Sequence, residues 1–115
     1  EQSCGCHFVS KPDPELVADA THYIRNQPPD IFFIQLDAID AAGHAHGFGT
    51  EPYLEQITTT DALVGLMVKA IRDVGVFDES LIVVLSDHGG DGTSHGSGHP
   101  TCMTTFWACC GPGPR

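Results

Sequence analysis

The sequence is 115 residues long, so it forms at most one domain and has room for only a modest hydrophobic core. Its 15 acidic and 5 basic residues give a formal net charge of −10, which argues against nucleic acid or an anionic membrane surface as the main partner. No apolar stretch approaches the roughly 20 residues that a membrane-spanning helix requires. The acidic excess instead suits a protein that gathers divalent cations, because bound metal offsets clustered carboxylates.

The cysteines indicate neither a zinc ribbon nor a disulfide framework. The five are Cys4, Cys6, Cys102, Cys109 and Cys110. An odd count leaves at least one free thiol. In an oxidising compartment, one disulfide could still form between the N-terminal pair, Cys4 and Cys6, and the three C-terminal cysteines. Because no CxxC pair occurs, a cysteine-based zinc site is disfavoured.

The first predicted element is an amphipathic helix of about four turns in "DPELVADATHYIRNQ", residues 13–27. Asp13 is a suitable N-cap, and Pro14 fits the first helical position. Pro28 and Pro29 end the helix. The short apolar run "IFFIQLD", residues 31–37, then predicts a strand buried on both faces.

Residues 38–50 read as a loop, after which a long helix begins near Pro52 and ends at Gly75. Its expected buried face comprises Tyr53, Ile57, Val64, Val68 and Ile71. Asp61 lies on the same stripe, where we expect it to bond to backbone or to a neighbouring loop. Residues 80–86 predict a second buried strand and residues 103–110 a third.

This order of elements predicts an α/β fold with a mostly parallel sheet flanked by helices. A right-handed crossover from the 31–37 strand through the long helix to the 80–86 strand makes these two strands parallel. Their C-terminal ends therefore meet at one edge, which is where open α/β sheets bind ligands.

Two polar clusters follow these strand ends. The first contains Asp37, Asp40, His44 and His46, and the second contains Asp87, His88, Asp91, His95 and His99. Imidazole with carboxylate is the ligand set of zinc and similar first-row ions, whereas calcium and magnesium prefer oxygen alone. The glycines among them allow sharp turns and close approach of the two segments. The sequence therefore predicts a metal site at this edge.

The residues that form these clusters also carry a resemblance to a known family. The stretches "LDAIDAAGHAHGFGTEPYLEQITTTDALVG", "LIVVLSDHGGDGTSHG" and "MTTFWACCGPG" resemble the alkaline phosphatase superfamily. Within it they are most similar to type I phosphodiesterases/nucleotide pyrophosphatases and to the ethanolamine-phosphate transferases of GPI-anchor synthesis. The resemblance implies an alkaline phosphatase-like fold with two divalent metal ions, usually zinc, at the C-terminal edge of the sheet.

The same resemblance implies a role for five residues. Asp40 and His44 of "DAAGH" match two ligands of one metal, and Asp87 and His88 of "SDHG" match two ligands of the other. The third ligand of the first metal matches His95 of "SHG", with His99 as the rival candidate. We expect His46 to face solvent or substrate.

The resemblance also defines what this sequence lacks. The family's nucleophilic Ser or Thr, and a further Asp ligand of the second metal, have no match in residues 1–30. No motif promotes Thr93, Ser94 or Thr101 to nucleophile. Residues 1–115 are therefore expected to be the C-terminal portion of a larger metallohydrolase domain, incomplete and inactive when isolated.

For the intact parent protein, the resemblance implies metal-dependent hydrolysis of phosphodiester or phosphate-ester bonds, with a small-molecule or lipid-linked substrate. The alternatives are a phosphoethanolamine transferase, a sulfatase or phosphomutase relative, and a non-catalytic metal-binding fragment. The resemblance favours an extracellular or lumenal location, and the sequence does not indicate an oligomeric state.

Overall fold

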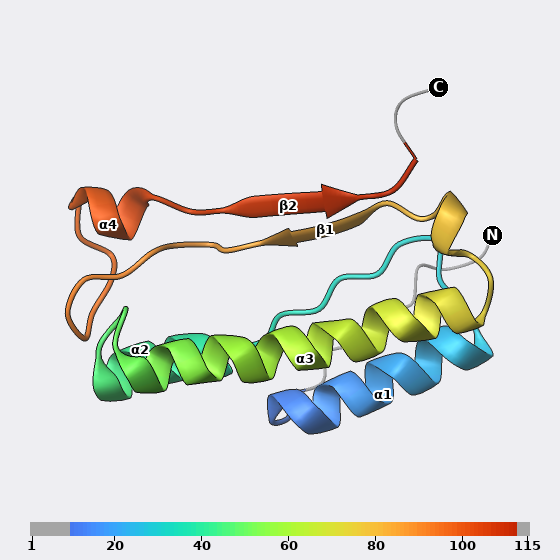
Figure 1. Cartoon of the computed structure of the whole chain (residues 1–115), viewed down its shortest axis with the longest axis horizontal. Helices are drawn as coiled ribbons and strands as arrows, with labels where there is room; N and C mark the ends of the chain where they lie inside the picture. The colour runs from blue at the N-terminus through green and yellow to red at the C-terminus, as the bar shows by residue number, and fades with distance from the viewer. Residues whose placement is uncertain (1–9, 113–115) are drawn as a thin grey trace.

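The structure, a computed structural model, describes residues 10–112. Its elements are α1 (Asp13–Asn26), α2 (Ala38–His46), α3 (Glu51–Asp73), the short 3-10 helix η1 (Phe77–Glu79), β1 (Ile82–Leu85), α4 (Pro100–Met103) and β2 (Trp107–Cys110). They form two layers (Figure 1). The helical layer contains α1, α2 and α3, and the strand layer contains β1 and β2, with α4 at one end.

The hydrophobic core lies between α1 and α3. Val17 and Ala20 of α1 are buried against Met67 of α3, and Ile34 and Leu36 of the connecting segment pack against them. The two predicted helices are therefore confirmed.

The buried face of α3 is turned slightly from the predicted one. Its buried residues are Thr60, Met67 and Ala70, whereas Ile57 is 38% exposed. Asp61 is exposed and makes no hydrogen bond within residues 10–112, so its predicted structural contact is wrong for the part described.

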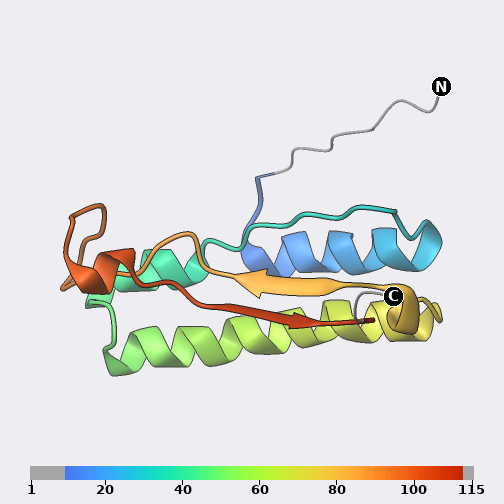
Figure 2. The same ribbon diagram turned by 90° about the horizontal axis from the view of Figure 1, so that it is seen from above.

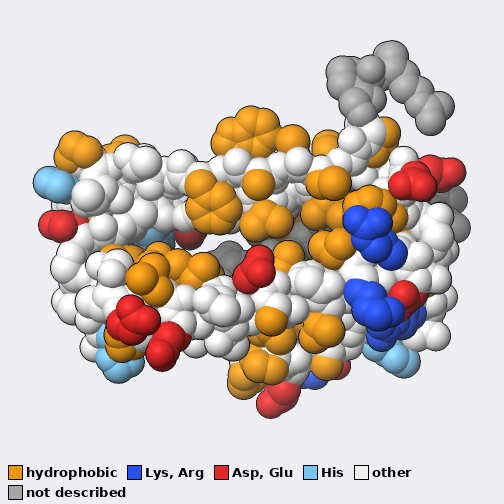
Figure 3. All heavy atoms as spheres, viewed as in Figure 1, with side chains coloured by type: hydrophobic (Ala, Val, Ile, Leu, Met, Phe, Trp, Pro, Cys, Tyr) orange, Lys and Arg blue, Asp and Glu red, His pale blue; other side chains and the backbone are white. Residues whose placement is uncertain are grey.

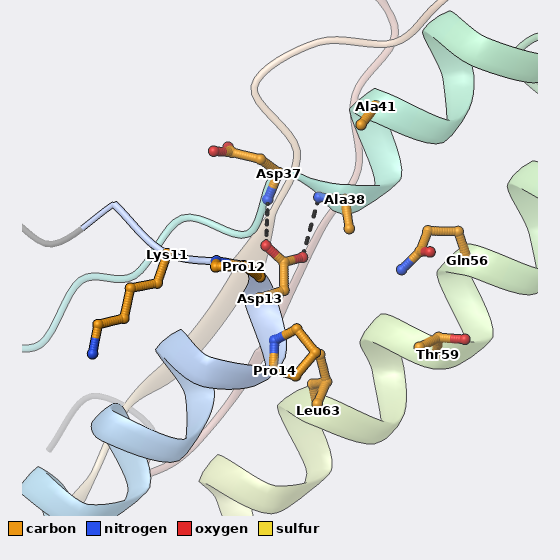
Figure 4. Close-up of a pocket in the computed structure, with 10 residues that line it drawn as sticks. All are labelled: Lys11, Pro12, Asp13, Pro14, Asp37, Ala38, Ala41, Gln56, Thr59 and Leu63. Atoms are coloured by element: carbon orange, nitrogen blue, oxygen red, sulfur yellow. Dashed lines mark hydrogen bonds between the residues drawn. The ribbon is translucent and has the colours of Figure 1, made fainter.

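Asp13 caps α2 and not its own helix. It is the first residue of α1, whose N-cap is Pro12. Its buried carboxylate accepts hydrogen bonds from the backbone N–H of Asp37 at 3.0 Å and of Ala38 at 3.1 Å, beside a pocket of about 370 Å³ (Figure 4). The first N–H groups of a helix lack partners and carry partial positive charge, so they attract this carboxylate. The prediction that Asp13 caps α1 is therefore wrong, because Asp13 caps α2 instead.

The segment 38–46, predicted as a loop, is helix α2. Its sequence "AIDAAGHAH" holds four alanines, the residue with the highest helix propensity. The helix ends at Gly47, whose φ of 98° is a conformation that residues with a side chain rarely adopt. The predicted loop, 38–50, contains Gly43, Gly47 and Gly49, but Gly43 lies inside the helix and only Gly47 ends it.

The segment 31–37 is extended but is not a strand, so this prediction is wrong. It runs in the same direction as β1 and leads from the end of α1 to the start of α2 (Figures 1 and 2). Ile34 and Leu36 pack against the core, whereas Ile31 and Phe33 are exposed. One side of the segment thus packs on the helices, but its backbone forms no ladder with β1 within the described residues.

The sheet of the described residues is antiparallel and has two strands, so the predicted mostly parallel sheet is wrong. Ile82 pairs with Cys110 and Leu85 with Trp107. The chain reverses direction between β1 and β2, and it does so without the crossover helix that a parallel connection requires. The predicted third strand, 103–110, is confirmed only in its second half, because α4 occupies 100–103.

Apolar and basic side chains gather on different parts of the surface. Hydrophobic side chains lie exposed over the strand layer (Figure 3), and the most exposed include Leu85 and Trp107. At the end of the helical layer, Arg25 and Lys69 both pair with Asp73. The Lys69 hydrogen bond lowers the pKa of Asp73 from its usual 3.8. None of the helices within 10–112 is long and apolar enough to cross a bilayer.

The cysteines of the described part form no disulfide with one another. Cys102 is buried, while Cys109 and Cys110 are exposed on β2. In a strand, neighbouring side chains point to opposite faces, which keeps these last two thiols apart. Cys4 and Cys6 lie outside the described residues.

Candidate metal centre

The two polar segments predicted from the sequence meet at one end of the molecule. Asp40 and His44 lie one turn apart on α2, so both side chains point from the same face of the helix. His88 follows β1 directly, and His95 lies further along the loop that leads to α4. Figure 1 shows this loop descending from the strand layer toward α2. We refer to Asp40, His44, His88 and His95 as the histidine–aspartate cluster.

The side chains of Asp40, His44 and His95 have the spacing of metal ligands. One ligand atom from each lies within 4.8 Å of the other two. Asp40 Oδ2 is 3.4 Å from His44 Nε2, and Asp40 Oδ1 is 3.5 Å from His95 Nε2. With metal–ligand bonds of about 2.0–2.2 Å, two ligands of a tetrahedral zinc ion lie about 3.4 Å apart. These separations exceed a normal hydrogen bond but agree with that value.

One oxygen of Asp40 has no hydrogen-bond partner. Asp40 Oδ1 is buried and unpaired within the described structure. Its nearest charged or ionisable neighbours are His95 Nε2 and, at 3.9 Å, His88 Nε2. Burying a carboxylate oxygen without a partner is unfavourable, and a cation bound between it and the imidazoles removes this penalty. The residues present therefore fit a metal ion.

Backbone carbonyls set the orientation of two histidines. His44 Nδ1 lies 2.9 Å from the carbonyl oxygen of Thr93, and His88 Nδ1 lies 2.9 Å from that of Gly89. A carbonyl only accepts, so each Nδ1 carries a proton, and in the neutral imidazole each Nε2 then has its lone pair free to bind a metal. This is the tautomer and the second contact typical of metal-binding histidines.

His88 connects this group to Asp87. His88 Nε2 is 3.7 Å from Asp87 Oδ2, and the His88 ring stacks on His95 with centroids 3.7 Å apart. The Asp87 side chain is 74% exposed, so this half of the site is more open than the half around Asp40. A pocket of about 230 Å³ opens beside Asp87, His88 and His95.

Four of the nine residues in the predicted clusters lie apart from this centre. Asp37 accepts a hydrogen bond from Gln35, and Asp91 bonds to Ser94 through its backbone. His46 is exposed at the last position of α2. His99 is the N-cap of α4, where its Nδ1 lies 2.7 Å from Thr101 Oγ1. The geometry thus brings His95, and not His99, to Asp40 and His44.

Two contributors to the centre were not predicted from the sequence. One is the carbonyl of Thr93, which leaves no signal in the sequence because every residue has a carbonyl. The other is Phe48, whose ring lies edge-on to both His44 and His95. A single aromatic between glycines, in "GFG", was the only available hint.

A mixed α/β chain with an imidazole–carboxylate centre is typical of metal-dependent enzymes. The family model described as type I phosphodiesterase / nucleotide pyrophosphatase matches residues 7–106, and the chain belongs to this family. Membership confirms the resemblance to the alkaline phosphatase superfamily and implies that the chain is a fragment of its α/β fold. No solved structure gives a significant match.

Similar curated proteins are of two kinds. GPI ethanolamine phosphate transferase 1 of Aspergillus fumigatus is 32% identical over 110 residues, which cover 92% of this chain and 10% of that protein. The Mus musculus protein of the same name is 33% identical over 90 residues, 76% of this chain and 10% of its own length. Ectonucleotide pyrophosphatase/phosphodiesterase family member 1 of Mus musculus is 27% identical over 64 residues, 56% of this chain and 7% of its own length. The chain thus spans about a tenth or less of these relatives.

Proposed function

We propose that this chain supplies most of the metal ligands of a phosphoryl-transfer centre. Asp40, His44 and His95 bind one divalent ion, zinc, and Asp87 and His88 bind a second. The observation that carries the proposal is the unpaired, buried Asp40 Oδ1 beside the Nε2 atoms of His88 and His95. Imidazole and carboxylate together favour zinc over calcium or magnesium.

The reaction that fits is hydrolysis of a phosphodiester or phosphate ester. A pair of bound cations in such a centre stabilises the attacking and leaving oxygens and the charge of the transferring group. The chain's own part is to hold the ligands rigidly, on a helix and on carbonyl-anchored imidazoles, next to a pocket of about 230 Å³. With a net charge of −10, it also depends on cations to attract a phosphate.

A second candidate is transfer of phosphoethanolamine to an alcohol in place of water. Its support is the comparison: the transferase of Aspergillus fumigatus aligns with 92% of this chain, whereas the mouse pyrophosphatase/phosphodiesterase aligns with 56%. Both reactions use the same ligands and differ in the acceptor. Turnover by the parent protein with and without an added alcohol acceptor, followed by product analysis, distinguishes them.

We further propose that the chain is the C-terminal portion of a larger catalytic domain. The resemblance assigns the nucleophile to a segment that this sequence does not match, so the 115-residue chain is expected to hydrolyse a chromogenic phosphodiester only at background rate with zinc present. A normal enzymatic turnover would show that a hydroxyl of this chain serves as nucleophile.

Zinc titration of the 115-residue chain by calorimetry tests the metal centre. We expect one tight site and one weak site, because Asp40, His44 and His95 give three ligands whereas Asp87 and His88 give two. His44→Ala should remove the tight site. His46→Ala is the matched control, since it removes an exposed imidazole from the same helix, and it should bind zinc like the wild type.

The pH dependence of this binding is a second readout. Imidazole binds metal only when neutral, and an ordinary histidine becomes protonated as the pH falls through about 6.5. Zinc should therefore raise the melting temperature strongly at pH 7.5 and hardly at all at pH 5.5. Two equally tight sites, or tight binding that survives His44→Ala, would contradict the ligand assignment.

A further inference from the structure

Phe48 lies between two histidines that come from different parts of the chain. It follows α2 by two residues, and its ring centroid is 6.0 Å from that of His44 and 6.3 Å from that of His95. Both contacts are edge-to-face, with interplanar angles of 76° and 89°. Edge-to-face packing is a favoured arrangement of flat π systems. A single side chain thus contacts one ligand on the helix and one on the loop.

Two glycines make room for this ring. A Cβ placed on Gly43 of α2 would lie 2.5 Å from Phe48 Cε1, and a Cβ on Gly90 would lie closer still to the ring. Real Cβ atoms do not approach other atoms that closely, so the ring is seated directly against the backbone of α2 and of the loop after β1. This seating also explains a buried glycine inside a helix, which costs about 1 kcal/mol relative to alanine.

The backbone of Phe48 is fixed to the same loop. Its N–H donates to the carbonyl oxygen of Gly92 at 2.7 Å, one residue before Thr93, whose carbonyl orients His44. The ring and the peptide group therefore both join the end of α2 to the loop that carries His88 and His95.

We propose that Phe48 is a positioning residue that sets the separation of His44 and His95 and thereby the geometry and affinity of the metal site. This inference rests on the proposed function, and it adds a residue that controls metal binding without being a metal ligand itself. His44 is then held twice, through Nδ1 by the Thr93 carbonyl and through its ring by Phe48. Replacing the ring by a smaller, flexible side chain leaves a gap into which both imidazoles can move.

The test uses cobalt(II) in place of zinc, because its visible absorption reports the number and arrangement of ligands. In Phe48→Leu we expect the cobalt dissociation constant to rise about 10- to 100-fold, the usual effect of losing a residue that orients metal ligands, and the visible spectrum to change. Far-UV circular dichroism checks that the fold is kept. Tyr53→Leu is the matched control, because the Tyr53 ring lies tilted against Phe48, with centroids 5.4 Å apart, and has no ring contact with either histidine in the described structure. It should leave the cobalt spectrum unchanged.

A second variant, Gly43→Ala, keeps the Phe48 ring but places a methyl group in the space that the ring occupies. Its added methyl should displace the ring and weaken cobalt binding, and the double variant with Phe48→Leu should lose less than the two single changes combined. Gly65→Ala, where the added Cβ meets open space, controls for the substitution itself.

The outcomes separate this inference from the proposed function. If the wild type binds cobalt and both Phe48→Leu and Gly43→Ala bind it equally well with the same spectrum, the positioning role is wrong and the metal centre stands. If the wild type binds no cobalt or zinc, the metal centre itself is refuted, and the role of Phe48 falls with it. If Phe48→Leu does not fold, Gly43→Ala decides.

Discussion

The helical layer and the strand layer of this chain differ in how much apolar surface they bury. In the helical layer, Val17 and Met67 are 1% and 9% exposed. In the strand layer, Val83, Leu85 and Trp107 are 47%, 61% and 71% exposed. Both layers are built from apolar stretches that the sequence pattern alone would place in a core.

The difference comes from the number of neighbours that each layer has. Helix α3 packs against both α1 and α2, so its inward residues are enclosed. Strand β1 pairs only with β2 on one edge, and within residues 10–112 no helix covers the outward face of the pair. The stability of the described structure therefore depends on the helical layer, whereas the strand layer offers an apolar face to its surroundings.

The largest expected effect is in the helical core. Met67→Ala should lower the free energy of unfolding by about 2–5 kcal/mol, since it removes buried methylene groups and leaves a cavity. Urea denaturation measures this value. Leu66→Ala is the matched control, because Leu66 is the adjacent residue of α3 and is 51% exposed. Equal losses for the two variants would contradict the assignment of the core.

The next largest effect should come from the contact between α1 and α2. Asp13→Ala removes the acceptor of the Asp37 and Ala38 N–H groups and should destabilise the chain by about 1–3 kcal/mol. Because α2 carries Asp40 and His44, zinc binding should weaken as well. Glu15→Ala, an exposed carboxylate in the same first turn, should change neither property. A fully stable Asp13→Ala variant would show that the α2 N-terminus finds another acceptor.

The smallest effect is expected in the strand layer. Leu85→Ala should change the free energy of unfolding by no more than about 0.5 kcal/mol, because Leu85 is mostly exposed already. The same urea measurement applies. A loss close to that of Met67→Ala would mean that the outward face of β1 is covered in solution. Size-exclusion chromatography at two protein concentrations would then show whether a second copy covers it.

Helices α1 and α3 could be predicted because local signals define them. Pro14 and the two prolines at 28 and 29 bound the first helix, and Gly75 follows the second. Helix α2 was missed because Gly43 inside it, and Gly47 and Gly49 directly after it, are typical of loops. The alanines, and the four-residue spacing of Asp40 and His44, were the signal that favoured a helix. The sheet could not be predicted correctly, because pairing between strands depends on contacts that no local pattern encodes.

The candidate metal centre was predictable in composition but not in detail. The clustering of imidazoles and carboxylates after two apolar runs indicated where metal ligands would gather. The choice between His95 and His99 could not be made from spacing alone. It depends on the fold of the loop, in which His99 begins α4 while His95 reaches Asp40. Their roles as ligands remain predictions until metal binding is measured.

The contact between His44 and the Thr93 carbonyl joins positions 49 residues apart, and this separation has a consequence for the order of folding. We expect Asp40 and His44 to come together as soon as one turn of α2 forms, and His95 to reach them only after α3 and β1 have folded. An ion held by both segments cross-links a loop of about 50 residues, for which the chain-entropy model gives about 4 kcal/mol. Because that link forms late, zinc should leave the folding rate almost unchanged and act on the unfolding rate, slowing loss of the native state.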